Sequence, residues 1–209
     1  MKILVACEFS GKVRDAFIAQ GHDAMSCDFL PSEGVHRDRH YQGSVLTLMP
    51  SKAWDMLIAF PPCTYLCSSG LHWNKRVEGR QAKTDDALKF VSTLLNADIP
   101  MIALENPIGC ISTQIRKPDQ MIQPYEFGDD ASKRTCLWLK GLPKLEPTER
   151  ISGRMVNGKE RWSNQTDSGQ NKLAPSETRA KERSTTYDGI ANAMANQWGK
   201  LHPLELIRR

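Results

Sequence analysis

A cysteine that directly follows two prolines is the residue best placed for covalent chemistry. The apolar run Trp54–Phe60 ends at Pro61 and Pro62, and Cys63 comes next. Proline has a fixed φ and no amide N–H, so the pair holds the following side chain in one direction. A thiol held in this way, partly exposed and near cations, can act as a nucleophile. We predict that Cys63 is a nucleophile, with a buried structural thiol as the alternative.

A carboxylate and two cations adjoin two other apolar runs. Glu105 directly follows Ile99–Leu104, while Lys133 and Arg134 precede Thr135–Leu139. A carboxylate directly after an apolar run is more typical of a functional site than of a helix cap or an ordinary ion pair. We predict that Glu105 and Arg134 act in catalysis, with a solvated charge pair as the alternative for the two cations.

The cysteines and histidines lack the spacing of a metal site. Cys63 and Cys67 form a Cys-x-x-x-Cys pair, with no His or second cysteine pair nearby to complete a zinc site. The other cysteines are scattered through apolar segments, as buried thiols in a reducing compartment are. We expect no metal.

The elements that must position these residues follow an α/β pattern. An apolar run over residues 2–7 leads through a turn at Gly11 into a helical period, and a second run ends at Asp28. A strand, a glycine turn, a helix, a strand and an acid in this order open a nucleotide-binding sheet. Further strands are predicted at 54–60, 99–104 and 135–139, and helices at 85–97 and 187–200. The predicted fold is α/β, a mostly parallel sheet flanked by helices, with ligands at the carboxyl ends of its strands.

Composition excludes several classes of protein. The chain has 209 residues, 40% of them hydrophobic and 25% charged, which argues against disorder and fibres. No apolar run approaches the ~20 residues of a membrane span, and the apolar N-terminus meets Glu8 too early for a signal peptide. The net charge of +4 permits an anionic partner without demanding one. We expect a cytoplasmic protein without membrane association.

Three segments resemble motifs of the DNA cytosine 5-methyltransferase family. Phe60–Cys63 is similar to its Pro-Pro-Cys nucleophile motif, and Glu105–Pro107 to its Glu-Asn-Val motif. Ile190–Met194 is similar to its Ile-Gly-Asn-Ala-Val segment. Order and spacing agree from residue 3 to residue 199, as in short versions from phage and bacterial genomes that lack a large target-recognition domain. The resemblance implies a Rossmann-like fold that uses S-adenosylmethionine, in the cytoplasm of a bacterium or a phage-infected host.

The resemblance also implies roles for the predicted catalytic residues. Cys63 as thiolate would attack carbon 6 of cytosine, and Glu105 would contact nitrogen 3 and the exocyclic amine. Carbon 5 would then take the methyl group. Arg134 would bind the carbonyl oxygen of the base or a flanking phosphate, although Ser132 and Cys136 replace the glutamine and second arginine of that motif. The cytosine must be flipped out of a duplex or lie in a single strand.

The cofactor end departs from the family pattern. Cys7–Lys12 stands where the family has Phe-x-Gly-x-Gly-Gly, and Gly11 is its one secure match. Asp28 fits the acid that holds ribose hydroxyls, and Ser44 stands where the family has an acid near the adenine. The predicted cofactor-binding residues are Glu8, Ser10, Gly11, Asp28, Ser44, Pro61 and Asn192.

The sequence further predicts how the chain divides and what it binds. We expect a catalytic and cofactor-binding domain at 1–142, and a C-terminal segment at 173–209 that returns to it. The polar residues 143–172 between them are predicted to be a loop and a reduced DNA-recognition region. The predicted substrate-binding residues are Lys133, Arg154, Lys159 and Arg161.

Cations on a loop suit phosphate contact and a few base edges, so we expect DNA as the partner and a short sequence context. No obligatory protein partner is evident. Three alternatives stay open: action on a free cytosine nucleotide, transfer of a modified methyl group, and a catalytically weak DNA-binding module.

Overall fold

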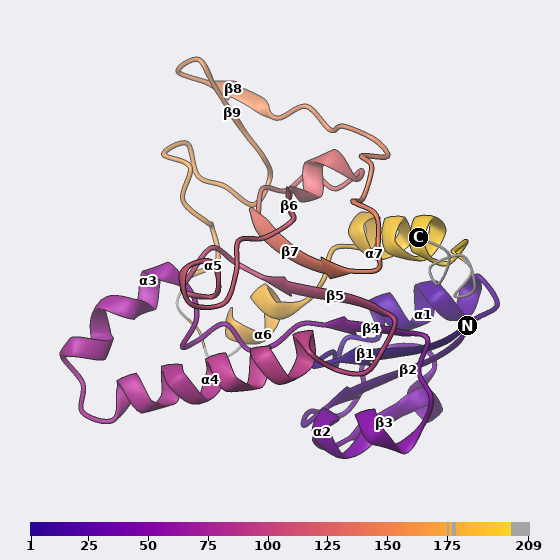
Figure 1. Cartoon of the computed structure of the whole chain (residues 1–209). Coiled ribbons are helices and arrows are strands. Elements are labelled where there is room, and N and C mark those ends of the chain that lie inside the picture. The colour runs from indigo at the N-terminus through magenta and orange to yellow at the C-terminus, as the bar shows by residue number, and fades with distance from the viewer. Residues whose placement is uncertain (175, 177–178, 202–209) are drawn as a thin grey trace.

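One seven-stranded sheet organises the chain (Figure 1). The structure is a computed structural model that describes residues 1–174, 176 and 179–201. Its strands are β1 (Lys2–Ala6), β2 (Asp23–Asp28), β3 (His40–Gln42), β4 (Met56–Ala59), β5 (Met101–Asn106), β6 (Gln120–Ile122) and β7 (Thr135–Lys140). Their order is β3-β2-β1-β4-β5-β7-β6, and β7 alone runs antiparallel to both of its neighbours. The predicted mostly parallel, Rossmann-like α/β fold is therefore confirmed.

Helices and a hairpin surround this sheet. The helices are α1 (Lys12–Ala19), α2 (Val45–Leu48), α3 (Ser68–Leu71), α4 (Arg80–Leu95), α5 (Ile111–Gln114), α6 (Arg179–Ser184) and α7 (Asp188–Trp198). A separate hairpin pairs β8 (Arg154–Val156) with β9 (Lys159–Arg161). Figure 1 shows α7 beside α1, and the hairpin extending away from the sheet.

Alternation along the strands builds two cores, one on each face of the sheet. In β5, Met101 and Ala103 join the core that contains α1 and α7, whereas Ile102 and Leu104 join the core that contains α4. Successive strand residues point to opposite faces, so each buried strand has to be apolar throughout. This explains the continuous apolar runs of β1, β4 and β5.

The strand order reverses between β1 and β4. Chain segments that leave these two strands diverge to opposite sides of the sheet, and ligands of α/β sheets bind at the carboxyl ends where the strand order reverses. The turn after β1 contains Cys7 at φ 58° and Gly11 at φ 76°, and β4 is followed by Pro61 and Pro62. A positive φ is costly for cysteine and marks a constrained backbone at the end of β1.

Several element boundaries differ from the sequence-based expectations. Helix α4 begins at Arg80 rather than Asp85, and β5 continues to Asn106 instead of ending at Leu104. Strands β3 and β6 and helix α6 were not predicted, because short elements carry too few residues to show a period. Residues 143–172, predicted to be a loop, contain the β8–β9 hairpin. Within the predicted C-terminal segment, residues 175, 177, 178 and 202–209 lie outside the described part.

Within the described residues, no helix has the length and apolar character that a bilayer crossing requires.

The carboxyl group of Glu8 closes the start of α1. It accepts hydrogen bonds from the backbone N–H groups of Val13 (2.6 Å) and Arg14 (3.4 Å), and only 3% of Glu8 is exposed. Burial raises the pKa of Glu8 from 4.5 to about 7, against the opposing effect of those two bonds and of the Arg14 charge. Glu8 therefore caps the N-terminus of α1, where its carboxyl group accepts hydrogen bonds from backbone N–H groups that have no partner within the helix.

This burial predicts a pH-dependent stability. A raised pKa means that the folded chain holds the proton more tightly than the unfolded chain, so the stabilisation is complete below pH 4.5 and lost as pH rises through about 7. In the wild-type chain this group should lower the free energy of unfolding by on the order of 3 kcal/mol as pH rises, at 1.36 kcal/mol per pKa unit. Glu8→Gln should abolish that change. Urea unfolding of both proteins at pH 5 and pH 8 measures it. An identical pH dependence in the two proteins would contradict the account.

Candidate active site at the ends of β4 and β5

A side-chain hydrogen bond joins the ends of the two strands that carry Cys63 and Glu105. The amide of Asn106 donates to the carbonyl oxygen of Pro61 at 2.7 Å, and both residues are buried. Pro61 and Pro62 have no N–H, so this turn cannot be held by donating to a neighbouring strand. The carbonyl of Cys63 then accepts from the backbone N–H of Cys67 at 3.0 Å, which closes a tight turn. Cys63 itself is exposed at the carboxyl edge of the sheet.

Glu105 lies within β5 and faces a small pocket. It points to the same face as Ala103, toward the core of α1 and α7. The pocket that it lines has a volume of about 20 Å³, room for roughly one water. Its polar lining comes from Glu105, Lys133, Thr135, Ser184, Thr186 and Tyr187. Burial raises the pKa of Glu105, although the charge of Lys133 and a hydrogen bond with Thr135 act in the opposite direction.

Lys133 is the cation that Cys63 and Glu105 share. Its ammonium donates to the carbonyl of Arg183 at 2.8 Å. Surrounding protein atoms raise the pKa of the Cys63 thiol, as do Cys67 and Glu105, while the charges of Lys133 and Arg183 lower it. Lys133 therefore lowers the pKa of both groups, while Arg183 acts on Cys63 and Thr135 acts on Glu105. These groups form a local electrostatic unit with a thiol, a carboxyl group and two cations.

Arg134, predicted to be catalytic, does not line this pocket. Its side chain is exposed, and its charge acts on Tyr125 and Cys136 rather than on Cys63 or Glu105. Lys133, which sequence analysis assigned to substrate binding, takes the position expected for Arg134. Adjacent strand-entry residues point in opposite directions, and the sequence alone does not reveal which of the two cations faces inward.

Sequence analysis missed Asn106, Thr135 and Tyr187 as site residues. Asn106 positions the Pro61 turn, Thr135 hydrogen-bonds Glu105, and Tyr187 lines the pocket. Only Asn106 had a signal, because it follows Glu105 within a recognised tripeptide. The others reach the pocket from β7 and from the segment before α7.

Two of the residues predicted to bind the cofactor lie at the carboxyl ends of the neighbouring strands β1 and β2. Asp28 ends β2, and one of its oxygens accepts from the N–H of Leu30 at 2.9 Å. Gly11 adopts the left-handed conformation that lets the chain turn after β1. A carboxylate and a glycine turn at these strand ends fit the ribose and the close backbone approach of a nucleoside cofactor. The residues present at these strand ends therefore fit the ribose end of S-adenosylmethionine.

The other predicted cofactor residues have local roles. Glu8 caps α1, with Ser10 donating to it at 3.4 Å, and Ser44 caps α2 by accepting from the N–H of Leu46. The carbonyl of Pro61 is taken by Asn106, and Asn192 is exposed on α7. Asp28 and the turn at Gly11 are therefore better placed to bind a cofactor than these residues are.

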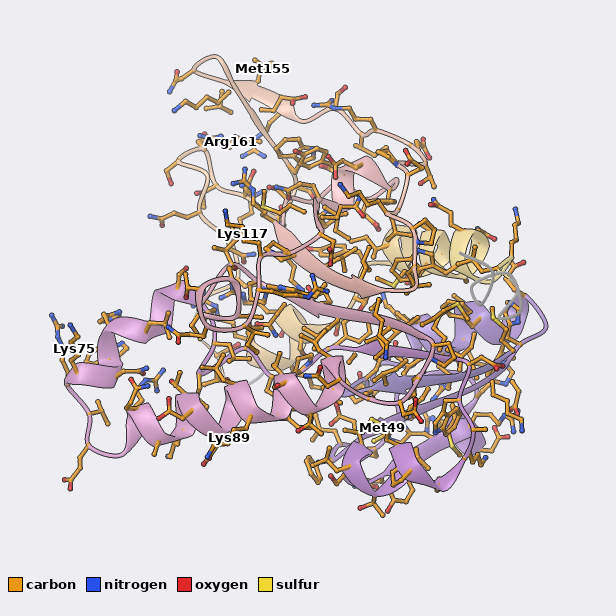
Figure 2. All side chains as sticks on the ribbon, viewed as in Figure 1. Met49, Lys75, Lys89, Lys117, Met155 and Arg161 are labelled. Atoms are coloured by element: carbon orange, nitrogen blue, oxygen red, sulfur yellow. The ribbon has the colours of Figure 1, made fainter. Side chains whose placement is uncertain are left out.

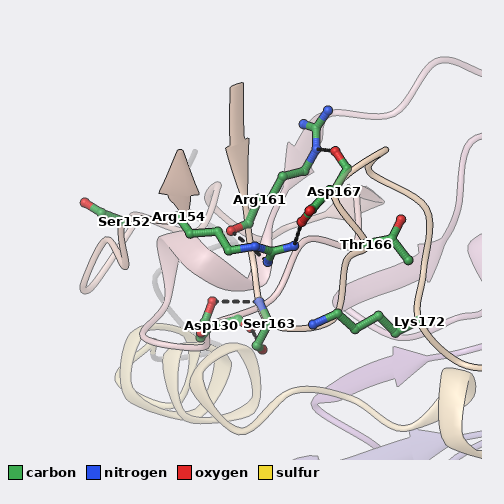
Figure 3. Close-up of a pocket in the computed structure, with 8 residues that line it drawn as sticks. All are labelled: Asp130, Ser152, Arg154, Arg161, Ser163, Thr166, Asp167 and Lys172. Carbon is green, nitrogen blue, oxygen red and sulfur yellow. Dashed lines mark hydrogen bonds and ion pairs between the residues drawn. The ribbon is translucent and has the colours of Figure 1, made fainter. Parts of the chain in front are cut away.

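The arginines predicted to bind DNA hold the hairpin segment together. Arg154 donates to the carbonyls of Trp162 and Gln165. It also pairs with Asp167 at 2.9 Å (Figure 3). Arg161 donates to the carbonyl of Asp167 at 3.1 Å. Together with Lys172 these side chains line an open cavity of about 460 Å³. Lys159 is exposed.

No protein-family model matches the chain, and no curated protein matches it in sequence. Among solved structures, it is similar to a candidate DNA modification methyltransferase encoded within an E. coli prophage. The TM-score is 0.42 and the sequence identity 12%, over 66% of this chain and 46% of that one. The chain thus spans less than half of that protein, and so distant a likeness assigns no activity.

The shared cation predicts how the Cys63 thiol reacts. Lys133→Ala should raise the pKa of Cys63, so less thiolate exists at a given pH and alkylation slows, because only the thiolate reacts. Iodoacetamide labelling of the Cys63 peptide, followed by mass spectrometry across pH, measures the shift toward higher pH. Arg134→Ala removes the same charge one residue away and should leave the profile unchanged. Equal effects of the two substitutions would contradict the assignment.

Proposed function

We propose that this chain transfers a methyl group from S-adenosylmethionine to carbon 5 of cytosine in DNA, through a covalent adduct with Cys63. One observation carries the proposal: the Asn106–Pro61 hydrogen bond holds the turn of a proline-oriented cysteine against the strand that bears Glu105. Nucleophile and acid then stand at the carboxyl ends of adjacent strands β4 and β5, where α/β sheets carry their sites.

Each group has a task in this reaction. The thiolate of Cys63 adds to carbon 6 and drives electron density into the ring. Glu105, whose pKa is raised by burial, keeps a proton to donate to nitrogen 3 as negative charge develops there. Lys133 stabilises the thiolate before attack. Carbon 5 would take the methyl group that S-adenosylmethionine supplies. Loss of the carbon 5 proton to solvent would then break the bond to sulfur and restore the thiolate, and nitrogen 3 would return its proton to Glu105.

The proposed cofactor site lies at the carboxyl ends of β1 and β2, beside the point where the strand order reverses. S-adenosylmethionine would supply the methyl group there. The carboxylate of Asp28 would accept hydrogen bonds from ribose hydroxyls, and the turn at Gly11 would let the backbone approach the ligand closely. We further propose that residues 1–142 form the catalytic unit, with residues 143–172 contacting DNA through Lys159 and Lys172.

The proposal predicts a trapped adduct with Cys63. DNA that contains 5-fluorocytosine should link covalently to the wild-type chain in the presence of S-adenosylmethionine, because fluorine replaces the proton that must leave. Cys63→Ala should abolish both the link and methyl transfer, while Cys67→Ala should retain them. Denaturing electrophoresis and transfer of a labelled methyl group measure the two outcomes. Normal turnover by Cys63→Ala would refute the covalent mechanism.

Glu105 should matter for turnover more than for binding. Its contact strengthens as charge moves onto the ring, so Glu105→Gln should lower kcat by roughly 10²–10⁴, as expected for lost acid–base help. The exposed Glu149 offers a matched control, and Glu149→Gln should leave kcat unchanged. Steady-state methyl transfer separates kcat from KM. A change confined to KM would mean that Glu105 has a structural role.

A further inference from the structure

A basic projection follows the cysteine turn, and sequence analysis assigned it no function. We call residues 72–83 the basic arm; it comprises a 3-10 turn (His72–Lys75), a loop and the first residues of α4. It contains four Lys or Arg residues and one acid, Glu78, whereas the whole chain carries a net charge of only +4. The arm thus has a net charge of +3, against +4 for the whole chain. Figure 2 shows Lys75 at its outer tip.

The cations of the arm are available to a partner. Among ion pairs between described residues, none involves the arm, and Lys75, Arg76 and Lys83 are exposed. The hairpin differs, because Arg154 is paired with Asp167 and Arg150 with Glu160. Phosphate binding needs cations that are not already neutralised. The arm therefore offers a stronger phosphate-binding surface than the hairpin arginines.

An aromatic ring is exposed on the arm between these cations. Trp73 is 45% exposed, while the other four tryptophans are each at most 8% exposed. The guanidinium of Arg76 lies 5.8 Å from the centre of the Trp73 ring. An exposed tryptophan is costly to leave in water, and an indole beside cations is the arrangement on which unpaired bases stack.

The arm is attached directly to the turn of the nucleophile. Arg80 donates to the carbonyl of Thr64 at 3.2 Å and lies over the ring of Tyr65, 4.9 Å from its centre. Thr84, one turn further along α4, donates to the carbonyl of Tyr65 at 3.0 Å. These contacts fix the base of the arm to the two residues that follow Cys63. A strand bound to the arm would reach the cysteine turn.

We propose that the basic arm binds an unpaired stretch of DNA, with Trp73 stacking on a base and Lys75, Arg76 and Lys83 contacting phosphates. The ring and the cations are the two components of single-strand binding surfaces, which favour exposed bases over a closed duplex. The choice of cytosine DNA as substrate rests on the proposed function, whereas the preference for an unpaired strand rests on the arm alone.

The tryptophan content of the chain provides a direct test. Because Trp73 alone is exposed, its fluorescence is the red-shifted, solvent-quenchable part of the emission. A short single-stranded cytosine-containing oligonucleotide should quench this part, and the same sequence as a closed duplex should quench it less. Trp73→Phe should lack the quenchable component. Equal quenching by both forms, or none by the single strand, would overturn the proposal.

Binding measurements with matched variants complete the test. Trp73→Ala should weaken single-strand binding about 5- to 100-fold, as expected for one lost base stack, and Lys75→Ala should flatten its salt dependence. Lys89→Ala removes the same charge from the exposed side of α4, away from the arm, and should change neither. Unchanged binding by Trp73→Ala would refute stacking. Methyl transfer to single-stranded DNA at undiminished rate by Trp73→Ala would refute the arm while leaving the proposed function standing. Binding of the single strand by the wild-type chain without methyl transfer would do the reverse.

Discussion

The hydrogen bond from Asn106 to the carbonyl of Pro61 is the constraint on which the candidate site depends. Two consecutive prolines give the chain after β4 a stiff direction but no donor with which to anchor itself. Asn106 supplies the missing donor from the neighbouring strand, and both groups are buried, where an unmade bond costs about 1–3 kcal/mol. Because Glu105 precedes Asn106 in β5, this one contact sets the cysteine turn and the carboxyl group relative to each other.

Strand alternation lets Glu105 and Asn106 perform different tasks. Asn106 continues the face of Ile102 and Leu104, and Glu105 continues that of Ala103. One residue therefore anchors a turn while its neighbour enters a pocket on the opposite face. A shift of one residue in the register of β5 would exchange these faces and lose both contacts.

The general arrangement was predictable from sequence, because apolar runs and glycine or proline turns reveal strands and their ends. Cys63 and Glu105 fall at such ends, and their proximity follows from the parallel pairing of β4 and β5. Side-chain direction was not predictable. Glu8 and Ser44 have types that suit a cofactor, yet both cap helices, a local contact that competes with ligand binding. Arg154 likewise has the type that suits DNA, and it bonds the carbonyls of its own segment.

The contacts of Lys133 connect access to the pocket with its electrostatics. The cavity beside Glu105 is about 20 Å³, and Ser184, Thr186 and Tyr187 form part of its wall. A base is far larger than the single water that such a volume admits, so these residues must move for a base to reach Glu105. Lys133 bonds the carbonyl of Arg183, next to that wall, while its charge acts on Cys63 and Glu105. Displacement of the wall would free the ammonium from that carbonyl. Under the proposed function, the movement that admits a base would thus also change the contacts of the cation that lowers the pKa of Cys63.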